Sequence, residues 1–197
     1  VKFITEIRLT NNKFFGMQLA GKRIILGITG SIAAYKAALI TRLLVLEGAD
    51  VQVVMSDSAA EFISPLTLSV LSKKPVLTQM VSPGQTWNNH VELGIWADML
   101  VVAPISANTL AAFANGTCQN LLQAVFLSAR CPVMVAPAMD HDMFLHEATQ
   151  ANIALLKKRG VLFIDPAKGE LASGIIGEGR MEEPECILEK ICSYFDS

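Results

Sequence analysis

The chain has 197 residues, of which 52% are hydrophobic and 17% are charged, and its formal net charge is −2. This length favours one domain with one core, and the apolar composition is typical of strands that helices cover on both faces. The scattered basic residues exclude the electrostatic footprint of a nucleic-acid-binding protein. An apolar surplus at this length also predicts a homo-oligomer, because obligate interfaces resemble a core cut in half.

Neither a disulfide framework nor a zinc site is predicted. The four cysteines, Cys118, Cys131, Cys186 and Cys192, show no CxxC pairing and no clustering with histidine, so we expect reduced, mostly buried thiols. No segment approaches the roughly 20 apolar residues of a membrane span, and no signal peptide is recognisable. We therefore expect a cytoplasmic protein that does not bind membranes.

Residues 1–16 form an N-terminal extension to the single domain that we expect at 17–197. Met17 and the linker-like residues after it have the character of a natural start. The extension is either non-native sequence or a genuine strand or helix that packs on the oligomer, and the sequence favours neither alternative.

Apolar runs and helical spacing alternate along the rest of the chain. In chain order they predict a strand at 23–29, a helix at 32–47, a strand at 50–55, a helix at 65–71, a short strand at 75–78, a loop at 82–89, a helix ending at 97, a strand at 99–103, a helix starting near 107, a strand at 132–136, a helix at 150–159, a strand at 161–164, a loop at 166–179 and a helix at 183–195. This alternation predicts an α/β fold with a doubly wound, Rossmann-like parallel sheet in three layers.

Polar side chains gather at the ends of these strands, where open parallel sheets bind ligands. Gly30 and Ser31 follow the first strand, 56–58 follows the second, and 104–109 follows the run at 99–103. Each hydroxyl alone is more simply a helix N-cap, but the last loop offers Ser, Asn and Thr around a fixed proline. Together the loops favour a phosphorylated cofactor. The GxGxxG and GxxxxGK[ST] motifs are absent, so NAD and ATP rank lower.

His90 and the segment 137–144 are the other candidates for a functional role. A histidine suits proton transfer near neutral pH, although a lone histidine is more often an ordinary polar residue. The segment follows a strand directly, and Met139 and Met143 either pack a planar ring or fill a gap before a helix. Its Asp-His-Asp run at 140–142 is rejected as a metal site, because adjacent residues cannot all point at one ion.

Several of these segments form an ordered set of motifs. They are Gly30 to Lys36, His90 to Leu93, Pro104 to Thr109, Asn115-Gly116 with Asn120 to Leu122, Pro137 to Met143, and Gly177 to Met181. The set resembles the homo-oligomeric flavin-containing cysteine decarboxylase family, and within it the phosphopantothenoylcysteine (PPC) decarboxylases. The resemblance runs from Gly21 to about Glu185.

The resemblance implies a flavodoxin-like domain, FMN bound between subunits, and a homo-oligomer that is a trimer or a dodecamer. It implies FMN-dependent decarboxylation of 4'-phosphopantothenoylcysteine to 4'-phosphopantetheine, a step of coenzyme A biosynthesis. The thiol carbon is first oxidised by hydride transfer to the flavin, because direct loss of CO2 from a cysteine amide would leave an unstabilised carbanion. It also implies fusion to, or partnership with, phosphopantothenate–cysteine ligase.

The resemblance assigns roles by position, and the segment 166–180 resembles a flap that excludes water from the substrate. The residues expected to contact FMN are Gly30, Ser31, Ile32, Ser56, Ser58, Ser106, Ala107, Asn108, Thr109 and Ala138. The expected catalytic residues are His90 as base, Asp140 and Ser173. The residues expected to contact the substrate are Asp140, Met143, Ala172, Gly174 and Arg180. No metal ligand is expected.

Two positions depart from the family pattern. The usual Ala-Cys-Gly of the flap is Ala172-Ser173-Gly174 here, and a hydroxyl is a far weaker acid than a thiol. The usual Asn is Asp140, which repels a substrate carboxylate unless one of the two carries a proton. Our hypothesis is that the changes compensate: a protonated Asp140 binds the carboxylate and assists the proton delivery that Ser173 cannot manage alone. The usual Trp of the motif is Phe144, a milder change.

Two alternative functions remain. One is a related flavoprotein acting on another thiol substrate, such as a peptidyl-cysteine decarboxylase or a flavin prenyltransferase, and the Gly-Glu-Gly-Arg-Met run at 177–181 counts against it. The other is a non-catalytic FMN-binding regulatory subunit that lost its activity with the flap cysteine. Such relatives carry long acidic tails, and none is present in this sequence.

Overall fold

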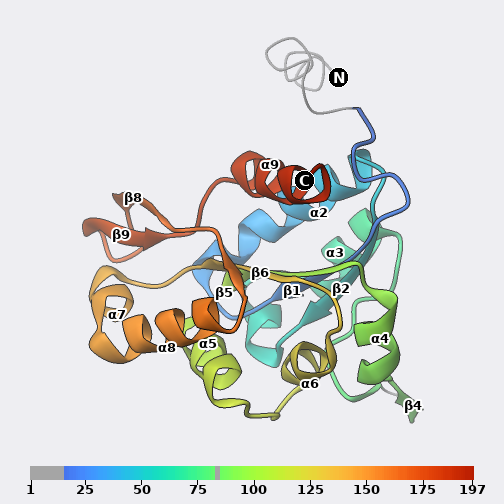
Figure 1. The fold of residues 1–197 in the computed structure, drawn as a ribbon, viewed down its shortest axis with the longest axis horizontal. Coiled ribbons are helices and arrows are strands. Elements are labelled where there is room, and N and C mark those ends of the chain that lie inside the picture. The colour runs from blue at the N-terminus through green and yellow to red at the C-terminus, as the bar shows by residue number, and fades with distance from the viewer. Residues whose placement is uncertain (1–15, 83–84) are drawn as a thin grey trace.

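A computed structural model describes residues 16–82 and 85–197 of the chain. In this part of the chain the main sheet is parallel, with the strand order β2-β1-β5-β6-β7. Its strands are β1 (Arg23–Ile28), β2 (Asp50–Met55), β5 (Met99–Ile105), β6 (Val133–Pro137) and β7 (Leu162–Phe163). Counted as successive parallel strands, this is the flavodoxin-like order, so the expected fold class is confirmed (Figure 1).

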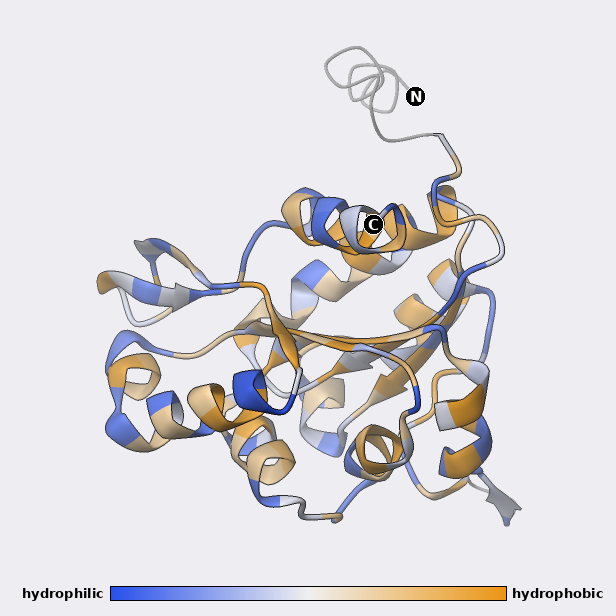
Figure 2. Ribbon diagram, viewed as in Figure 1, coloured by the Kyte–Doolittle hydropathy of each residue, from blue (hydrophilic) through white to orange (hydrophobic). Residues whose placement is uncertain are grey.

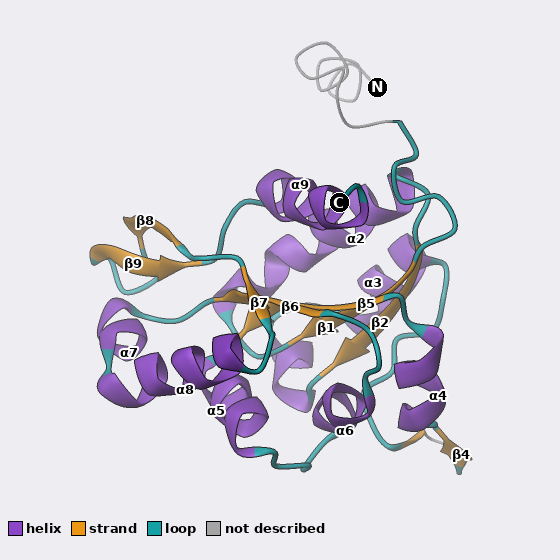
Figure 3. Ribbon diagram, viewed as in Figure 1, coloured by secondary structure: helices purple, strands orange, loops and turns teal. Residues whose placement is uncertain are grey.

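Helices cover both faces of the sheet and give the molecule three layers (Figures 1 and 3). The helices and 3-10 turns are η1 (Ile32–Tyr35), α2 (Lys36–Leu46), η2 (Asp57–Glu61), α3 (Pro65–Ser72), α4 (His90–Trp96), α5 (Ala107–Asn115), α6 (Leu121–Ser128), α7 (His141–Leu145), α8 (Glu147–Lys158) and α9 (Pro184–Phe195). Helices α2, α3 and α9 pack in one buried cluster, and α5, α6 and α8 in another.

The strands separate these two cores by alternating their side chains. Ile24 and Leu26 of β1 are fully buried against the α2 and α9 side, whereas Ile25 between them is buried against the α5 and α6 side. Because both faces of each strand are covered, the strands are continuous apolar runs, which appear as the hydrophobic centre of the molecule in Figure 2. The apolar composition that we expected of strands covered on both faces is thus confirmed.

Three of the expected elements differ in the structure. The strand expected to end before Pro104 continues to Ile105, because the Pro104 carbonyl accepts bonds from the N–H (3.2 Å) and the hydroxyl (2.9 Å) of Thr29. The strand expected at 75–78 is reduced to a single parallel bridge from Leu77 to Val54. The helix expected at 32–47 begins as the 3-10 turn η1.

The loop expected at 166–179 was wrong: it is an antiparallel hairpin of β8 (Ala167–Glu170) and β9 (Ile176–Arg180) (Figure 3). Its glycines and short strands hide the pattern in the sequence, although exposed and less exposed residues alternate along both strands. Within 82–89, β4 (Thr86–Trp87) pairs with β3 (Val81–Ser82), while residues 83–84 lie outside the described part.

The expectation for the N-terminal extension falls almost wholly on residues 1–15, which lie outside the described residues. Leu19 is fully buried, and its N–H donates to the Glu47 carbonyl at 3.0 Å. Within the described residues, no helix combines the length and the hydropathy needed to cross a bilayer.

The cysteines form no disulfide, as expected, but the expectation that they are mostly buried was wrong. Only Cys192 is buried, whereas Cys118 and Cys186 are exposed and Cys131 is intermediate. Cys118 and Cys186 lie on the surface because the first is in the loop after α5 and the second is on the outer face of α9.

Candidate functional site

Two adjoining cavities open at the carboxyl ends of β1 and β5, where the strand order reverses. The larger, of 640 Å³, is the hairpin cavity, because the β8–β9 hairpin supplies one wall. The smaller, of 450 Å³, is the serine cavity, because hydroxyl side chains line it. The residues lining both cavities are Gly30, Ser106, Ala107 and Met143, so the two form one continuous site.

Thr29 ties the first and third loops of this site together. Its hydroxyl donates to the Pro104 carbonyl at 2.9 Å and accepts the Ser106 N–H at 2.8 Å. Thr29 is 1% exposed, so these bonds are shielded from water. The chain therefore holds two strand-end loops together at the switch point, where a bound ligand would contact both of them.

The first and second loops meet at Gly30. A Cβ on this residue would lie 2.6 Å from the Ser58 Oγ, so only glycine permits the approach. The Ser58 hydroxyl is in turn 3.1 Å from the Ser56 hydroxyl. These contacts place two hydroxyl groups and a bare backbone on one wall of the serine cavity.

The N-terminus of α5 supplies the opposite wall. Ser106 caps this helix by accepting the Thr109 N–H at 3.4 Å, and Asn108 also lines the serine cavity. The capping alternative is therefore correct for Ser106, and also for Ser31, which accepts the Ala33 N–H at 3.2 Å. Ser56 makes no cap bond. Ser106 both caps α5 and lines the serine cavity, so helix capping and ligand binding do not exclude each other.

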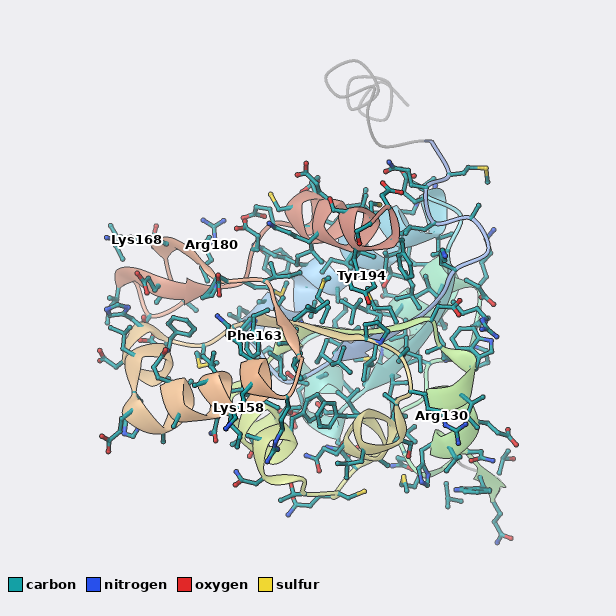
Figure 4. The ribbon with its side chains drawn as sticks, viewed as in Figure 1. Arg130, Lys158, Phe163, Lys168, Arg180 and Tyr194 are labelled. Atoms are coloured by element: carbon teal, nitrogen blue, oxygen red, sulfur yellow. The ribbon has the colours of Figure 1, made fainter. Side chains whose placement is uncertain are left out.

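The hairpin cavity has a buried cation in its wall. Lys36 is 3% exposed, and its Nζ lies 2.9 Å from the Met181 carbonyl oxygen and 3.0 Å from Glu183 Oε1. Arg180 donates to the same Glu183 oxygen at 2.8 Å. This network fixes the end of β9 to the start of α2, and Figure 4 labels Arg180 on the projecting hairpin.

The segment before α7 closes the other side of the hairpin cavity. The Met139 N–H donates to the Gly179 carbonyl at 3.1 Å. Gly179 has a φ of +124°, and a Cβ there would collide with the Met139 carbonyl oxygen. Asp140, which follows Met139 in the chain, is half-buried, lines the cavity and makes no cap bond to α7.

The structure brings most of the expected site residues together. Every residue expected to contact FMN lines one or both cavities: Gly30, Ser31, Ile32, Ser56, Ser58, Ser106, Ala107, Asn108, Thr109 and Ala138. Of the residues expected to serve catalysis or bind substrate, the hairpin cavity is lined by Asp140, Met143, Ala172 and Arg180. Within the described residues no group of His, Cys, Asp and Glu is suited to hold a metal ion.

Ser173 and Gly174 do not line either cavity. They are exposed in the turn between β8 and β9, where the Gly174 N–H donates to the Leu171 carbonyl at 2.9 Å. Leu171 and Ala172, which come just before these two residues, line the hairpin cavity. The expected proton donor is thus near the site but not part of its wall in the single chain.

His90 also lies outside the two cavities of its own chain, because it begins α4. That helix packs against α6, where Gly94 leaves room for the Ser128 carbonyl. The His90 Nδ1 is buried and has no hydrogen-bond partner among the described residues. Trp87 meets the ring edge-on, with a centroid distance of 6.1 Å.

Sequence reasoning gave no role to some residues of the cavity walls, namely Tyr35, Lys36, Gln119, Asn120, Glu170 and Leu171. A signal existed for Lys36, because it falls on the apolar stripe that Ala33, Ala37 and Ile40 form at helical spacing. No signal existed for Glu170, whose position on the wall depends on the hairpin that the sequence did not predict.

Comparison with known proteins settles the family. A family model described as Flavoprotein matches residues 16–196. The chain belongs to the flavoprotein family. It is 46% identical over 178 residues to the coenzyme A biosynthesis bifunctional protein CoaBC of Vibrio vulnificus (strain YJ016), covering 90% of this chain and 44% of that protein.

Another relative of this flavoprotein is a cysteine/cysteine sulfinic acid decarboxylase from an unknown prokaryotic organism. It is 52% identical over 134 residues, which are 68% of this chain and 37% of that protein. The chain therefore spans less than half the length of these curated relatives.

Two solved structures match this flavoprotein over nearly their full length. A cysteine-to-serine mutant of PPC decarboxylase complexed with pantothenoylaminoethenethiol has a TM-score of 0.79 and 33% identity, covering 89% of this chain and 99% of that one. The FMN binding protein AtHal3 has a TM-score of 0.75 and 32% identity, covering 89% and 97%. The resemblance to PPC decarboxylases is thus confirmed.

Proposed function

We propose that this flavoprotein is an FMN-dependent PPC decarboxylase, which converts 4'-phosphopantothenoylcysteine to 4'-phosphopantetheine in coenzyme A biosynthesis. The observation that carries the proposal is the continuous site at the strand ends, in which cofactor-type loops and the β8–β9 hairpin face each other. A CoaBC protein and a PPC decarboxylase among the similar proteins support the same reaction.

The lining of the serine cavity fits the phosphate and ribityl groups of FMN. Hydroxyls of Ser56, Ser58, Ser106 and Thr109 line it together with the first turn of α5, whose unpaired N–H groups favour an anion. The lining of this cavity has no Lys or Arg and includes the Asp57 carboxylate, so binding of the phosphate relies on neutral donors and the helix terminus. When bound, FMN would supply a hydride acceptor for the thiol carbon, so that CO2 is lost without the unstabilised carbanion that direct decarboxylation of a cysteine amide would leave.

The hairpin cavity is where we place the cysteine amide substrate. Asp140, Met143, Ala172 and Arg180 line it, and the hairpin covers it, which excludes water from reactive species. The buried Lys36 and the Arg180 guanidinium keep one carboxylate, Glu183, between them. They hold the hairpin end in place while Arg180 faces the cavity that receives an anionic substrate.

We propose that His90 acts in the site of a neighbouring copy, in a trimer or a dodecamer built from trimers. Two separate apolar faces support a head-to-tail ring. The first, on β4 and α4 beside His90, exposes Trp87 (57%), Val91 (42%) and Ile95 (51%). The second borders the hairpin cavity and exposes Ile32 (60%), Tyr35 (57%) and Leu39 (53%). Contact between the two faces would bring His90 to a partner's cavity and cover both.

Fusion to, or partnership with, a phosphopantothenate–cysteine ligase is also proposed, because this chain spans less than half of relatives that are named bifunctional. A cytoplasmic location is proposed on the ground that the four cysteines form no disulfide, which is the usual state of thiols in a reducing compartment.

A second candidate is decarboxylation of cysteine or its sulfinic acid, because the relative with that name is 52% identical to this chain. The two functions differ in the size and charge of the substrate. A cavity of 640 Å³ suits the long phosphorylated amide better than free cysteine.

The test is a comparison of kcat/KM for 4'-phosphopantothenoylcysteine, free cysteine, cysteine sulfinic acid and a peptide with a C-terminal cysteine. The protein is used with FMN bound, as judged by its yellow absorbance. The proposal predicts the highest value for the phosphorylated substrate. Equal or higher values for another substrate would overturn it, and a yellow protein that turns over none of them would favour the regulatory-subunit alternative.

A further inference from the structure

The β8–β9 hairpin forms a small sheet of its own, separate from the five-stranded sheet. Figure 1 shows it projecting beyond the sheet edge beside α7. Within the described residues its hydrogen bonds to the rest of the chain join it to the segment 139–141 and, through Arg180, to Glu183, while Lys36 donates to the Met181 carbonyl just beyond β9. The position of one wall of the hairpin cavity therefore depends on very few contacts.

His141 makes the most specific of these contacts. The Glu178 N–H donates to His141 Nδ1 at 3.0 Å. A backbone N–H can only donate, so in this 3.0 Å bond Nδ1 accepts with its lone pair and the neutral ring carries its proton on Nε2. The Glu178 carbonyl oxygen also lies near Nδ1, at 3.3 Å, and that longer contact would need the other tautomer. The bond joins the first residue of α7 to the middle of β9.

The hairpin is shaped to receive this ring. A Cβ on Gly177 would lie 2.6 Å from His141 Cγ, so the ring packs directly on the bare backbone of β9. Two residues further on, Gly179 leaves room for the Met139 carbonyl and accepts the Met139 N–H at 3.1 Å. The glycines on either side of Glu178 thus allow the chain segment before α7 to lie against the hairpin.

We propose that His141 is a positioning residue that latches the hairpin over the site. The latch keeps Ala172 and Arg180 on the cavity wall, and it fixes Asp140, whose two neighbours, Met139 and His141, are both bonded to β9. The effect on catalysis rests on the proposed function, whereas the latch itself does not.

The test uses His141→Phe, which keeps a ring to pack on Gly177 but cannot accept the bond. The matched control is His146→Phe. His146 also accepts a backbone N–H through Nδ1, but that bond is local: it comes from Ala148 at 3.2 Å and caps α8, not the hairpin. His141→Asn tests rescue, since its side-chain oxygen replaces Nδ1 as an acceptor.

Amide hydrogen exchange of Glu178 in the FMN-bound protein is the primary measurement. We expect exchange to be about tenfold faster in His141→Phe, because one hydrogen bond is lost, and unchanged in His146→Phe. His141→Asn should restore slow exchange, and Gly177→Ala, which displaces the ring, should reproduce His141→Phe. Unchanged exchange in both His141→Phe and Gly177→Ala would overturn the latch.

Steady-state kinetics provide the functional measurement. We expect His141→Phe to raise KM for 4'-phosphopantothenoylcysteine by about tenfold with a smaller fall in kcat, because an unlatched wall weakens substrate binding first. Faster exchange without any change in KM would contradict the positioning role. If the wild-type protein turns over no PPC, the proposed function fails, and the exchange measurement still decides the latch.

Discussion

At the scale of single residues, the structure separates the two positions at which we expect this chain to depart from the family pattern. Asp140 lines the hairpin cavity, whereas Ser173 lies in the exposed turn of the hairpin. The sequence located Asp140 correctly on the ligand edge because it follows β6 within three residues. It could not locate Ser173, whose direction depends on the hydrogen bonds of a tight turn.

The compensation hypothesis leads to a prediction about these two residues. Asp140→Asn restores the usual family residue, yet we expect it to lower kcat by about tenfold or more, because assisted proton transfer is lost. Adding Ser173→Cys to that variant restores the usual pair and should recover the rate. The measurement is single-substrate kinetics on FMN-loaded protein. Undiminished turnover by Asp140→Asn alone would end the hypothesis.

At the scale of elements, burial explains which strands and helices the sequence predicted and which it did not. Strands β1, β2, β5 and β6 are covered on both faces, so each is an apolar run that the sequence shows directly. The β8–β9 hairpin and α7 have no such core, and the contacts that shape them, such as Gly179 against Met139, join residues distant in sequence. The hairpin wall was therefore beyond prediction from the pattern of burial, although the family resemblance did name Ala172 and Arg180, whereas the loops at the strand ends followed from the pattern itself.

One ion pair shows how elements are joined away from the site. At the start of β1, Arg23 donates to Asp98, just before β5, through its backbone N–H (2.8 Å) and its guanidinium (2.8 Å). The hydrogen bond from the Arg23 side chain is the main cause that lowers the pKa of Asp98 below its ordinary value. Because the side chains are 43% and 31% exposed, water screens the pair and its contribution is modest.

A pH dependence of stability follows. The folded state binds the Asp98 proton less tightly than the unfolded state, so the pair stabilises the fold above the ordinary Asp pKa and loses this effect as pH falls through the lowered value. Asp98→Asn should lower the free energy of unfolding by about 1 kcal/mol at neutral pH. In urea titrations the gap between wild type and variant should shrink below about pH 4. A gap that stays constant down to the acid limit would contradict this assignment.

At the scale of the whole molecule, the separation of His90 from its own cavities is the strongest argument for a shared site. His90 was predicted from its motif, but a single sequence does not say which copy of the chain it serves. That answer needs the fold, in which the hairpin and α4 lie at opposite ends of the molecule, left and right in Figure 1.

Mixed oligomers test the shared site. His90→Asn and Asp140→Ala should each be inactive alone, and co-assembly should restore about a quarter of wild-type activity, the fraction of sites that combine an intact cavity with an intact partner histidine. The control is each variant mixed with itself. Absence of recovery in co-assembled protein would mean that both residues act within one chain.

The central claim is tested most directly by the mass of the product formed from 4'-phosphopantothenoylcysteine with the purified, FMN-bound protein. The account predicts a product lighter by one CO2, since oxidation and reduction cancel. A product lighter by CO2 and two hydrogens would contradict the proton delivery assigned to Asp140 and Ser173. Unchanged substrate beside an intact FMN spectrum would contradict the decarboxylase itself.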